Sequence, residues 1–63
     1  MRKIETILST GAAIWRDVEW DQFIVAPATF TRKQVEADHL GKCSFETERE
    51  DARDAASAHD WRV

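Results

Sequence analysis

A two-residue alternation of apolar and polar side chains runs through the first twenty residues and restricts the fold more than any other feature. The even-numbered positions are mostly apolar: Ile4, Leu8, Ala12, Ile14, Val18 and Trp20. The odd-numbered positions are mostly polar, and this period of two is typical of a half-buried β-strand. The pattern predicts a strand over residues 3–18, with a bulge or break at Gly11. A rival helix is less favoured, because Gly11 would lie in its interior and because Ile, Thr, Val and Trp favour strands.

The next segments predict a turn and a second strand, followed by a stretch with three interpretations. The letters EWDQF indicate a tight turn, and FIVAPATF indicates a central strand over residues 22–30 with a bulge at Pro27. Alternation over residues 34–46 favours a third strand. Thr31 and Gln34 resemble a capping box instead, with Phe30 stapled to Val35, which would begin a helix ending near Gly41. The remaining arrangement has a short helical turn at residues 32–38 and a strand only at 42–47.

The final segment predicts a helix over residues 48–59. Thr47 and Glu50 have the spacing of a capping box, and Ala52, Ala55 and Ala56 recur at helical spacing on one face. Small side chains let the helix lie close to a sheet whose bulk would come from Trp20, Phe23, Phe45 and Trp15, with Trp61 folding back. The fold class we expect is therefore α+β: a three-stranded antiparallel β-meander with one C-terminal α-helix packed on one face, in a single domain over residues 1–63.

The predicted strand and helix differ greatly in length. A strand over residues 3–18 would extend about 45–50 Å, whereas a helix of this size covers about 18 Å. A chain of 63 residues also buries only a marginal core, and a single cysteine excludes an internal disulfide. These points suggest a homodimer, or docking on a larger protein that covers the remaining sheet.

No residue pattern points to an enzyme, a cofactor or a metal. There is no glycine-rich phosphate loop, no serine-nucleophile motif and no EF-hand spacing. A Cys–His pair or a zinc site could be drawn from His39, Cys43 and His59, but paired ligands at short spacing are missing. We expect Cys43 to be a small buried hydrophobe and His59 to cap the helix end. We also expect no signal peptide, no membrane span and a cytoplasmic location.

Charge and aromatic residues supply the candidate binding surface. The net charge of −3 argues against direct nucleic-acid binding and favours a basic protein surface as the partner. Trp15 lies on the polar side of the alternation, where it forms either a second small core or an anchor for a partner. The acids are read either as a solvated face or as partner contacts. The candidate partner-binding residues are Trp15, Asp17, Glu19, Asp21, Glu48, Glu50 and Asp51.

Two local resemblances accompany these patterns. WRDVEWDQFIV followed by SFETEREDARDAA resembles small phage and mobile-element proteins with a strand, a turn, a strand and a T-x-x-E-D-A helix. Very small acidic chains of that kind are often inhibitors of host defence, such as anti-CRISPR proteins. The resemblance implies an inhibitor that occupies a basic, nucleic-acid-binding surface of a larger host complex. The last twenty residues are similar to the end of a respiratory complex I accessory subunit, with Asp60 in place of a glycine, which implies a structural or accessory subunit instead.

Overall fold

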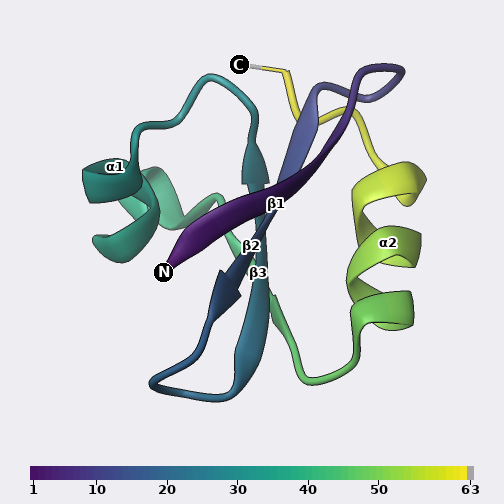
Figure 1. Ribbon diagram of the computed structural model, residues 1–63. Coiled ribbons are helices and arrows are strands. Elements are labelled where there is room, and N and C mark those ends of the chain that lie inside the picture. The colour runs from purple at the N-terminus through teal and green to yellow at the C-terminus, as the bar shows by residue number, and fades with distance from the viewer. Residues whose placement is uncertain (63) are drawn as a thin grey trace.

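The protein folds into one antiparallel sheet of four strands with a helix on each side (Figure 1). The computed structural model describes residues 1–62, within an envelope of 28 × 24 × 17 Å. The strands follow one another across the sheet in chain order: β1 (Arg2–Ile7), β2 (Ala12–Asp17), β3 (Gln22–Pro27) and β4 (Ser44–Glu46). The helical elements are α1 (Arg32–Glu36), the 3₁₀ turn η1 (His39–Gly41) and α2 (Arg49–Ala58). The α+β meander with a C-terminal helix is confirmed, but it has four strands rather than three.

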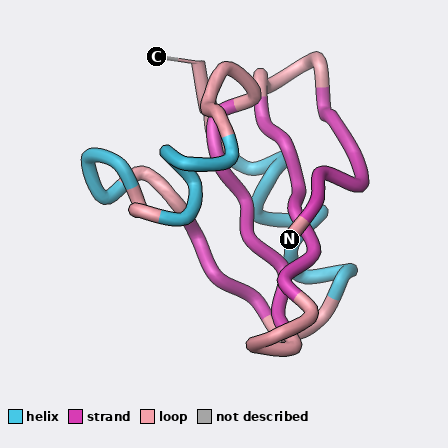
Figure 2. Tube along the Cα trace, turned by 60° about the vertical axis from the view of Figure 1, so that its left-hand side comes forward, coloured by secondary structure: helices cyan, strands magenta, loops and turns pink. Residues whose placement is uncertain are grey.

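The predicted strand over residues 3–18 is wrong, because a hairpin turn at residues 8–11 divides it into β1 and β2. Gly11 adopts a φ of +74° and donates its N–H to the carbonyl oxygen of Ile7 at 2.9 Å. A side chain at Gly11 would also collide with that of Arg62. The two hairpin turns consequently lie at opposite ends of a short sheet (Figures 1 and 2). Strands β1 and β2 have six residues each, so the excess of strand length that suggested a homodimer is not present.

The predicted turn and second strand are found with shifted limits. The turn occupies residues 18–21, where Asp21 has a φ of 49°, and β3 ends at Pro27 rather than at residue 30. Strands β2 and β3 pair without a register shift from Asp17 opposite Gln22 to Ala12 opposite Pro27, so the predicted bulge at Pro27 is wrong. Proline is tolerated there because the strand ends with it. The register shift occurs in β1, between Lys3 and Glu5.

The predicted strand over residues 34–46 is also wrong, and the arrangement with a short helix and a shorter strand is confirmed. Thr31 and Gln34 form the capping box: the Thr31 hydroxyl accepts from the Gln34 N–H at 3.3 Å, and the Gln34 side chain accepts from the Thr31 N–H at 2.7 Å. These contacts start α1 and place Val35 in the core at 1% exposure. Within residues 34–46, only Ser44–Glu46 pairs with β3.

Helix α2 begins and ends within one residue of its predicted limits. Its capping box is not formed, because Glu48 is the N-cap and makes no side-chain capping bond there. Ala52 and Ala56 are fully buried against the sheet, as their spacing predicts. Of the bulky residues expected beneath the helix, only Phe23 packs against this core.

The C-terminal end of α2 is held by residues from two other segments. The Thr10 hydroxyl donates to the Ala56 carbonyl at 2.6 Å, and the Trp61 indole N–H donates to the Ala55 carbonyl at 3.1 Å. The Trp61 backbone N–H donates to the Thr10 carbonyl at 2.8 Å. The predicted return of Trp61 onto the core is confirmed. His59 occupies the C-cap position, but it is Thr10 and Trp61 that satisfy these last carbonyls.

The sheet has a hydrophobic core on each face. On the α2 side the fully buried residues are Ala12, Ile14, Val25, Ala52 and Ala56. On the α1 side the buried residues are Ala13, Trp15, Ile24, Ala26, Phe30 and Val35, with Met1, Ala28 and Cys43 partly buried against them. A small domain therefore divides its apolar side chains between two thin layers.

Candidate functional site

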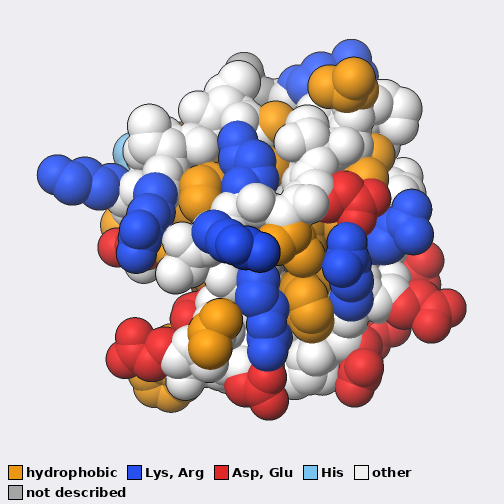
Figure 3. Space-filling view, in the orientation of Figure 1, with side chains coloured by type: hydrophobic (Ala, Val, Ile, Leu, Met, Phe, Trp, Pro, Cys, Tyr) orange, Lys and Arg blue, Asp and Glu red, His pale blue; other side chains and the backbone are white. Residues whose placement is uncertain are grey.

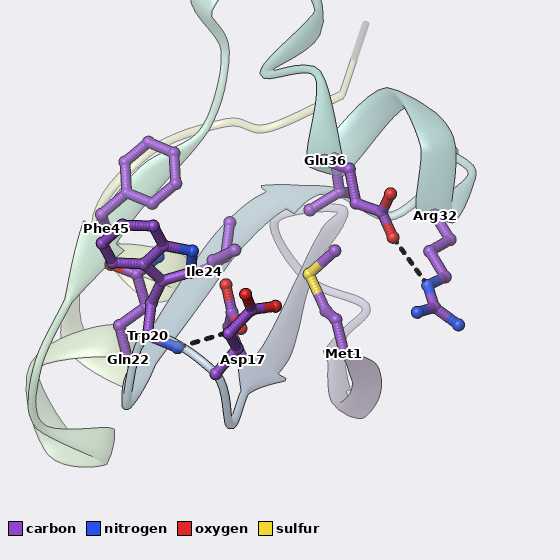
Figure 4. Close-up of a pocket in the computed structure, with 10 residues that line it drawn as sticks. Met1, Asp17, Trp20, Gln22, Ile24, Arg32, Glu36 and Phe45 are labelled. Atoms are coloured by element: carbon purple, nitrogen blue, oxygen red, sulfur yellow. Dashed lines mark hydrogen bonds and ion pairs between the residues drawn. The ribbon is translucent and has the colours of Figure 1, made fainter.

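Helix α1 has only five residues and leaves part of its sheet face open. The alternation of side chains places Asp17, Gln22 and Ile24 on this face, and Phe45 joins them because it pairs with Ile24. A hollow of about 540 Å³ remains between the β2–β3 hairpin, β4 and α1 (Figure 4). We call this hollow the groove. The residues that line it are Met1, Asp17, Glu19, Trp20, Gln22, Ile24, Arg32, Val35, Glu36 and Phe45.

Two exposed aromatic side chains form one wall of the groove. Trp20 is 74% exposed and Phe45 48% exposed, although both are large apolar groups that folding normally removes from water. Figure 4 shows them on the same side, with Arg32 and Glu36 of α1 on the opposite side and Asp17 between. Ile24 and Val35, exposed by 3% and 1%, belong to the core beneath. The groove therefore offers apolar rings above a fixed apolar base.

The charge of the groove is negative. Asp17, Glu19 and Glu36 contribute carboxylates, whereas Arg32 is the one cationic side chain among the lining residues and Met1 adds its terminal ammonium. The Arg32 guanidinium is already paired with Glu36 at 2.8 Å, one helical turn away. Asp17 accepts the Trp20 backbone N–H at 3.4 Å, which ties it to the turn that carries Trp20. The site thus joins aromatic surface to carboxylates that the local structure does not neutralise.

Arg16 fixes the hairpin that carries Trp20. Its guanidinium donates to the Asp21 carboxylate at 2.6 Å and to the Gln22 carbonyl at 3.3 Å. The same group lies 4.8 Å from the centre of the Phe23 ring. Arg16 therefore bridges the turn that carries Trp20, on the side opposite the groove.

The predicted acidic trio does not lie along one strand face. Residues 18–21 form a turn, so Asp17 and Glu19 line the groove while Asp21 pairs with Arg16. The second group, Glu48, Glu50 and Asp51, is exposed at the start of α2. Figures 1 and 3 show that the β2–β3 turn and the start of α2 lie toward the same end, where acidic side chains gather in this view. The fold thus brings together two acidic segments that are distant in sequence.

Trp15 is part of the core rather than an accessible anchor. It is 7% exposed and packs with Ile24, Phe30 and Val35 in the layer beneath α1. Its ring has the Lys3 ammonium 5.4 Å from its centroid, and its indole N–H has no hydrogen-bond partner within residues 1–62. A side chain so buried offers no surface to a partner. The interpretation as a second small core is confirmed, and Trp20 takes the place of Trp15 as the aromatic binding candidate.

The cysteine and the two histidines each make contacts with other residues. His39 stacks edge-on against Phe30, with centroids 5.7 Å apart, and His59 lies against Trp61. Burial, followed by the neighbouring Asp38, raises the pKa of the Cys43 thiol to about 12, which suppresses the reactive thiolate. In the described part of the chain no three His, Cys, Asp or Glu side chains gather to hold a metal ion. No helix within residues 1–62 is long and apolar enough to cross a membrane.

No protein-family model, curated protein or solved structure matches the chain.

Of the ten residues that line the groove, only Asp17 and Glu19 are binding candidates from the sequence. Asp17 and Glu19 were candidates because acids cluster there. Trp20 was assigned to the packing under the helix because it continued the even-numbered apolar series. Its position between two acids in a predicted turn was the signal for an exposed tryptophan. Phe45 and Glu36 carried no such signal, because only the α1 fold brings them to the hairpin.

Proposed function

We propose that this protein is a small acidic protein-binding module, and that the groove is the surface through which it contacts its partner. The partner is a larger protein or nucleoprotein complex that presents a basic surface. The observation that carries the proposal is the pair of exposed rings, Trp20 and Phe45, beside carboxylates of Asp17 and Glu19. Aromatic anchors concentrate binding energy in protein interfaces, and a complementary charge steers association.

The acidic residues at the start of α2 extend this surface. Glu48, Glu50 and Asp51 lie toward the end of the molecule where the β2–β3 turn lies (Figure 1). Exposed charges of this kind act mainly on the rate of encounter and on its dependence on salt. In this proposal the groove supplies affinity, whereas Glu48, Glu50 and Asp51 supply long-range attraction.

The narrower form of the proposal is a phage-type inhibitor of the anti-CRISPR kind. Such a protein would cover the nucleic-acid-binding surface of a host complex with its own acidic side chains. The local resemblance to mobile-element proteins and the net charge of −3 support this form. Competition between the purified protein and nucleic acid for the captured complex tests it. A partner that binds nucleic acid equally well with the protein present would exclude it.

The test of binding uses matched variants. Tagged wild-type protein is used to capture partners from the native host, and each captured partner is titrated against Trp20→Ala, Asp17→Lys and Asp54→Lys. Asp54 is exposed on α2 and lies outside the groove, so Asp54→Lys controls for charge reversal alone. We expect the two groove variants to weaken binding by about tenfold or more, and Asp54→Lys to have little effect. The proposal would be refuted if Trp20→Ala and Asp17→Lys bound the partner as tightly as Asp54→Lys and the wild type do.

A further inference from the structure

The groove holds the two kinds of group that recognise a guanidinium, which are flat aromatic faces and unpaired carboxylates. Trp20 and Phe45 are exposed over 74% and 48% of their surfaces. Asp17 and Glu19 have no ion-pair partner within residues 1–62. Resting on the proposed function, we propose that the groove receives an arginine side chain from the partner's basic surface.

The same hairpin already shows this recognition with one of its own residues. Arg16 lies with its guanidinium 4.8 Å from the Phe23 ring while donating to Asp21 at 2.6 Å. An aromatic ring and a carboxylate thus hold Arg16 on the side of the hairpin opposite the groove. On the groove side, Trp20 and Asp17 provide the same pair of groups, and Phe45 adds a second ring. The groove side therefore has the aromatic rings and the carboxylate, but no arginine is paired with Asp17 there within residues 1–62.

The arginine that lines the groove, Arg32, is not the partner of Asp17 and the two rings. Arg32 lines the groove, but its guanidinium is paired with Glu36 of the same helix at 2.8 Å. Figure 4 shows this pair across the groove from the two rings. With Arg32 and Glu36 balancing each other, Asp17 and Glu19 leave the lining side chains with a net charge of about −2, and the Met1 ammonium reduces the total to about −1 without forming an ion pair to either carboxylate within residues 1–62. A single incoming cation reduces that charge and brings its apolar stem onto the rings.

Arginine fits these groups better than lysine does. A guanidinium is planar, is weakly hydrated, stacks on aromatic faces and donates in a fork to a carboxylate, whereas an ammonium acts as a compact, strongly hydrated charge. Two rings beside carboxylates therefore select the planar cation. Citrulline has the shape of arginine without its charge, so it separates the guanidinium from the side-chain shape.

The test follows the three tryptophan indole N–H signals by nuclear magnetic resonance in ¹⁵N-labelled protein. The probes are short blocked peptides of glycine and serine with one central arginine, lysine or citrulline. We expect the arginine peptide to move the Trp20 signal and leave those of Trp15 and Trp61 unchanged. Lysine should bind severalfold more weakly and citrulline about tenfold more weakly than arginine. No movement of the Trp20 signal at about 20 mM arginine peptide would overturn the proposal, since weak single-residue contacts are detectable there.

Variants locate the contact. Asp17→Asn and Asp54→Asn each remove one negative charge, but only Asp17 lines the groove. We expect Asp17→Asn to weaken arginine binding severalfold and Asp54→Asn to leave it unchanged. Phe45→Ala should also weaken it, and an unchanged Trp15 indole signal would verify that this variant is folded. Equal binding of arginine and citrulline, or equal effects of the two asparagine variants, would contradict the inference.

The two proposals fail in different ways. The proposed function fails when captured partners bind Trp20→Ala and Asp17→Lys as well as they bind the wild type. The arginine inference fails alone when those variants weaken capture but the arginine and citrulline peptides bind equally. In that case the groove would meet the partner through its apolar surface and general charge.

Discussion

The two faces of the sheet are covered in opposite ways. On one face α2 places two alanines, Ala52 and Ala56, directly on small and branched sheet residues, and the centre of this core is fully buried. On the other face a five-residue helix covers the large side chain of Trp15 and leaves the groove beside it. The ten-residue helix brings small side chains close to the sheet, whereas the five-residue helix over large side chains leaves the groove beside it. The difference teaches that the length of the covering helix, rather than the apolar content of the sheet, decides which face stays open.

The largest effect should come from removing the ring at the centre of the α1 face. We expect Trp15→Ala to lower the free energy of unfolding by about 3–5 kcal/mol, because it leaves a cavity in a thin layer. Urea unfolding followed by circular dichroism measures it. Trp20→Ala is the control, since this exposed ring should change stability by no more than about 0.5 kcal/mol. Equal losses of unfolding free energy in Trp15→Ala and Trp20→Ala would mean that the α1 face is not divided into core and groove.

The next effect probes the closely packed α2 face. Ala56→Leu should lower the free energy of unfolding by about 1–3 kcal/mol, because no space separates this residue from the sheet. The matched control is Ala58→Leu, which adds the same side chain at an exposed position of the same helix. Melting temperatures of both variants decide the point. If Ala56→Leu has the same melting temperature as the wild type, the helix does not lie as close to the sheet as described.

A smaller effect concerns the hydrogen bond that joins the β1–β2 turn to the end of α2. Thr10→Val keeps the side-chain shape but removes the donor to the Ala56 carbonyl, so we expect a loss of about 1 kcal/mol. Thr6→Val, at an exposed position of β1, serves as the reference. Chemical denaturation of the two variants gives the difference. No difference between them would show that water satisfies the carbonyl equally well.

The effect that is smallest near neutral pH comes from Cys43, at the margin of the α1 face, and it grows only above pH 9. Its folded-state pKa is raised from 9.0 to about 12, because burial and Asp38 disfavour the thiolate. This contribution to stability is present below pH 9 and is lost as the pH rises toward 12. The free energy of unfolding should therefore decline over that window more in the wild type than in Cys43→Ala.

The same shift predicts a slow thiol reaction, which is easier to measure. At pH 8, a disulfide reagent should modify Cys43 on the order of a hundredfold more slowly in native protein than in urea. Equal rates would place the thiol in water and show the α1 face to be open there as well.

Some local patterns in the sequence predicted local structure correctly, whereas the capping box of Thr47 and Glu50 did not form. The capping box of Thr31 and Gln34 forms as its spacing indicates, and the alanine spacing of α2 correctly identified its buried side. Alternation correctly placed Trp15 on the side away from α2. In each case the interaction that forms the structure lies within a few residues of the pattern itself.

Alternation failed where the chain reverses. It continued smoothly past Gly11, although Ser9, Thr10 and Gly11 are turn-forming residues that could have indicated a hairpin. The register shift after Lys3 also turns Ile7, an odd-numbered residue, toward the α2 core. The groove was harder to predict, because it depends on how α1 folds back over the hairpin. Such long-range placement leaves no periodic signal in the residues that create it.

The hydrogen bond between Thr10 and Ala56 spans 46 positions of the chain. The two β-hairpins need only short loops to form, whereas this contact closes nearly the whole chain. Closing a long loop carries a larger entropic cost, so we expect the hairpins to form before α2 docks. Loss of the contact in Thr10→Val should then accelerate unfolding and leave the folding rate almost unchanged. The same bond that caps the end of α2 would thus set how long the native state persists rather than how quickly it is reached.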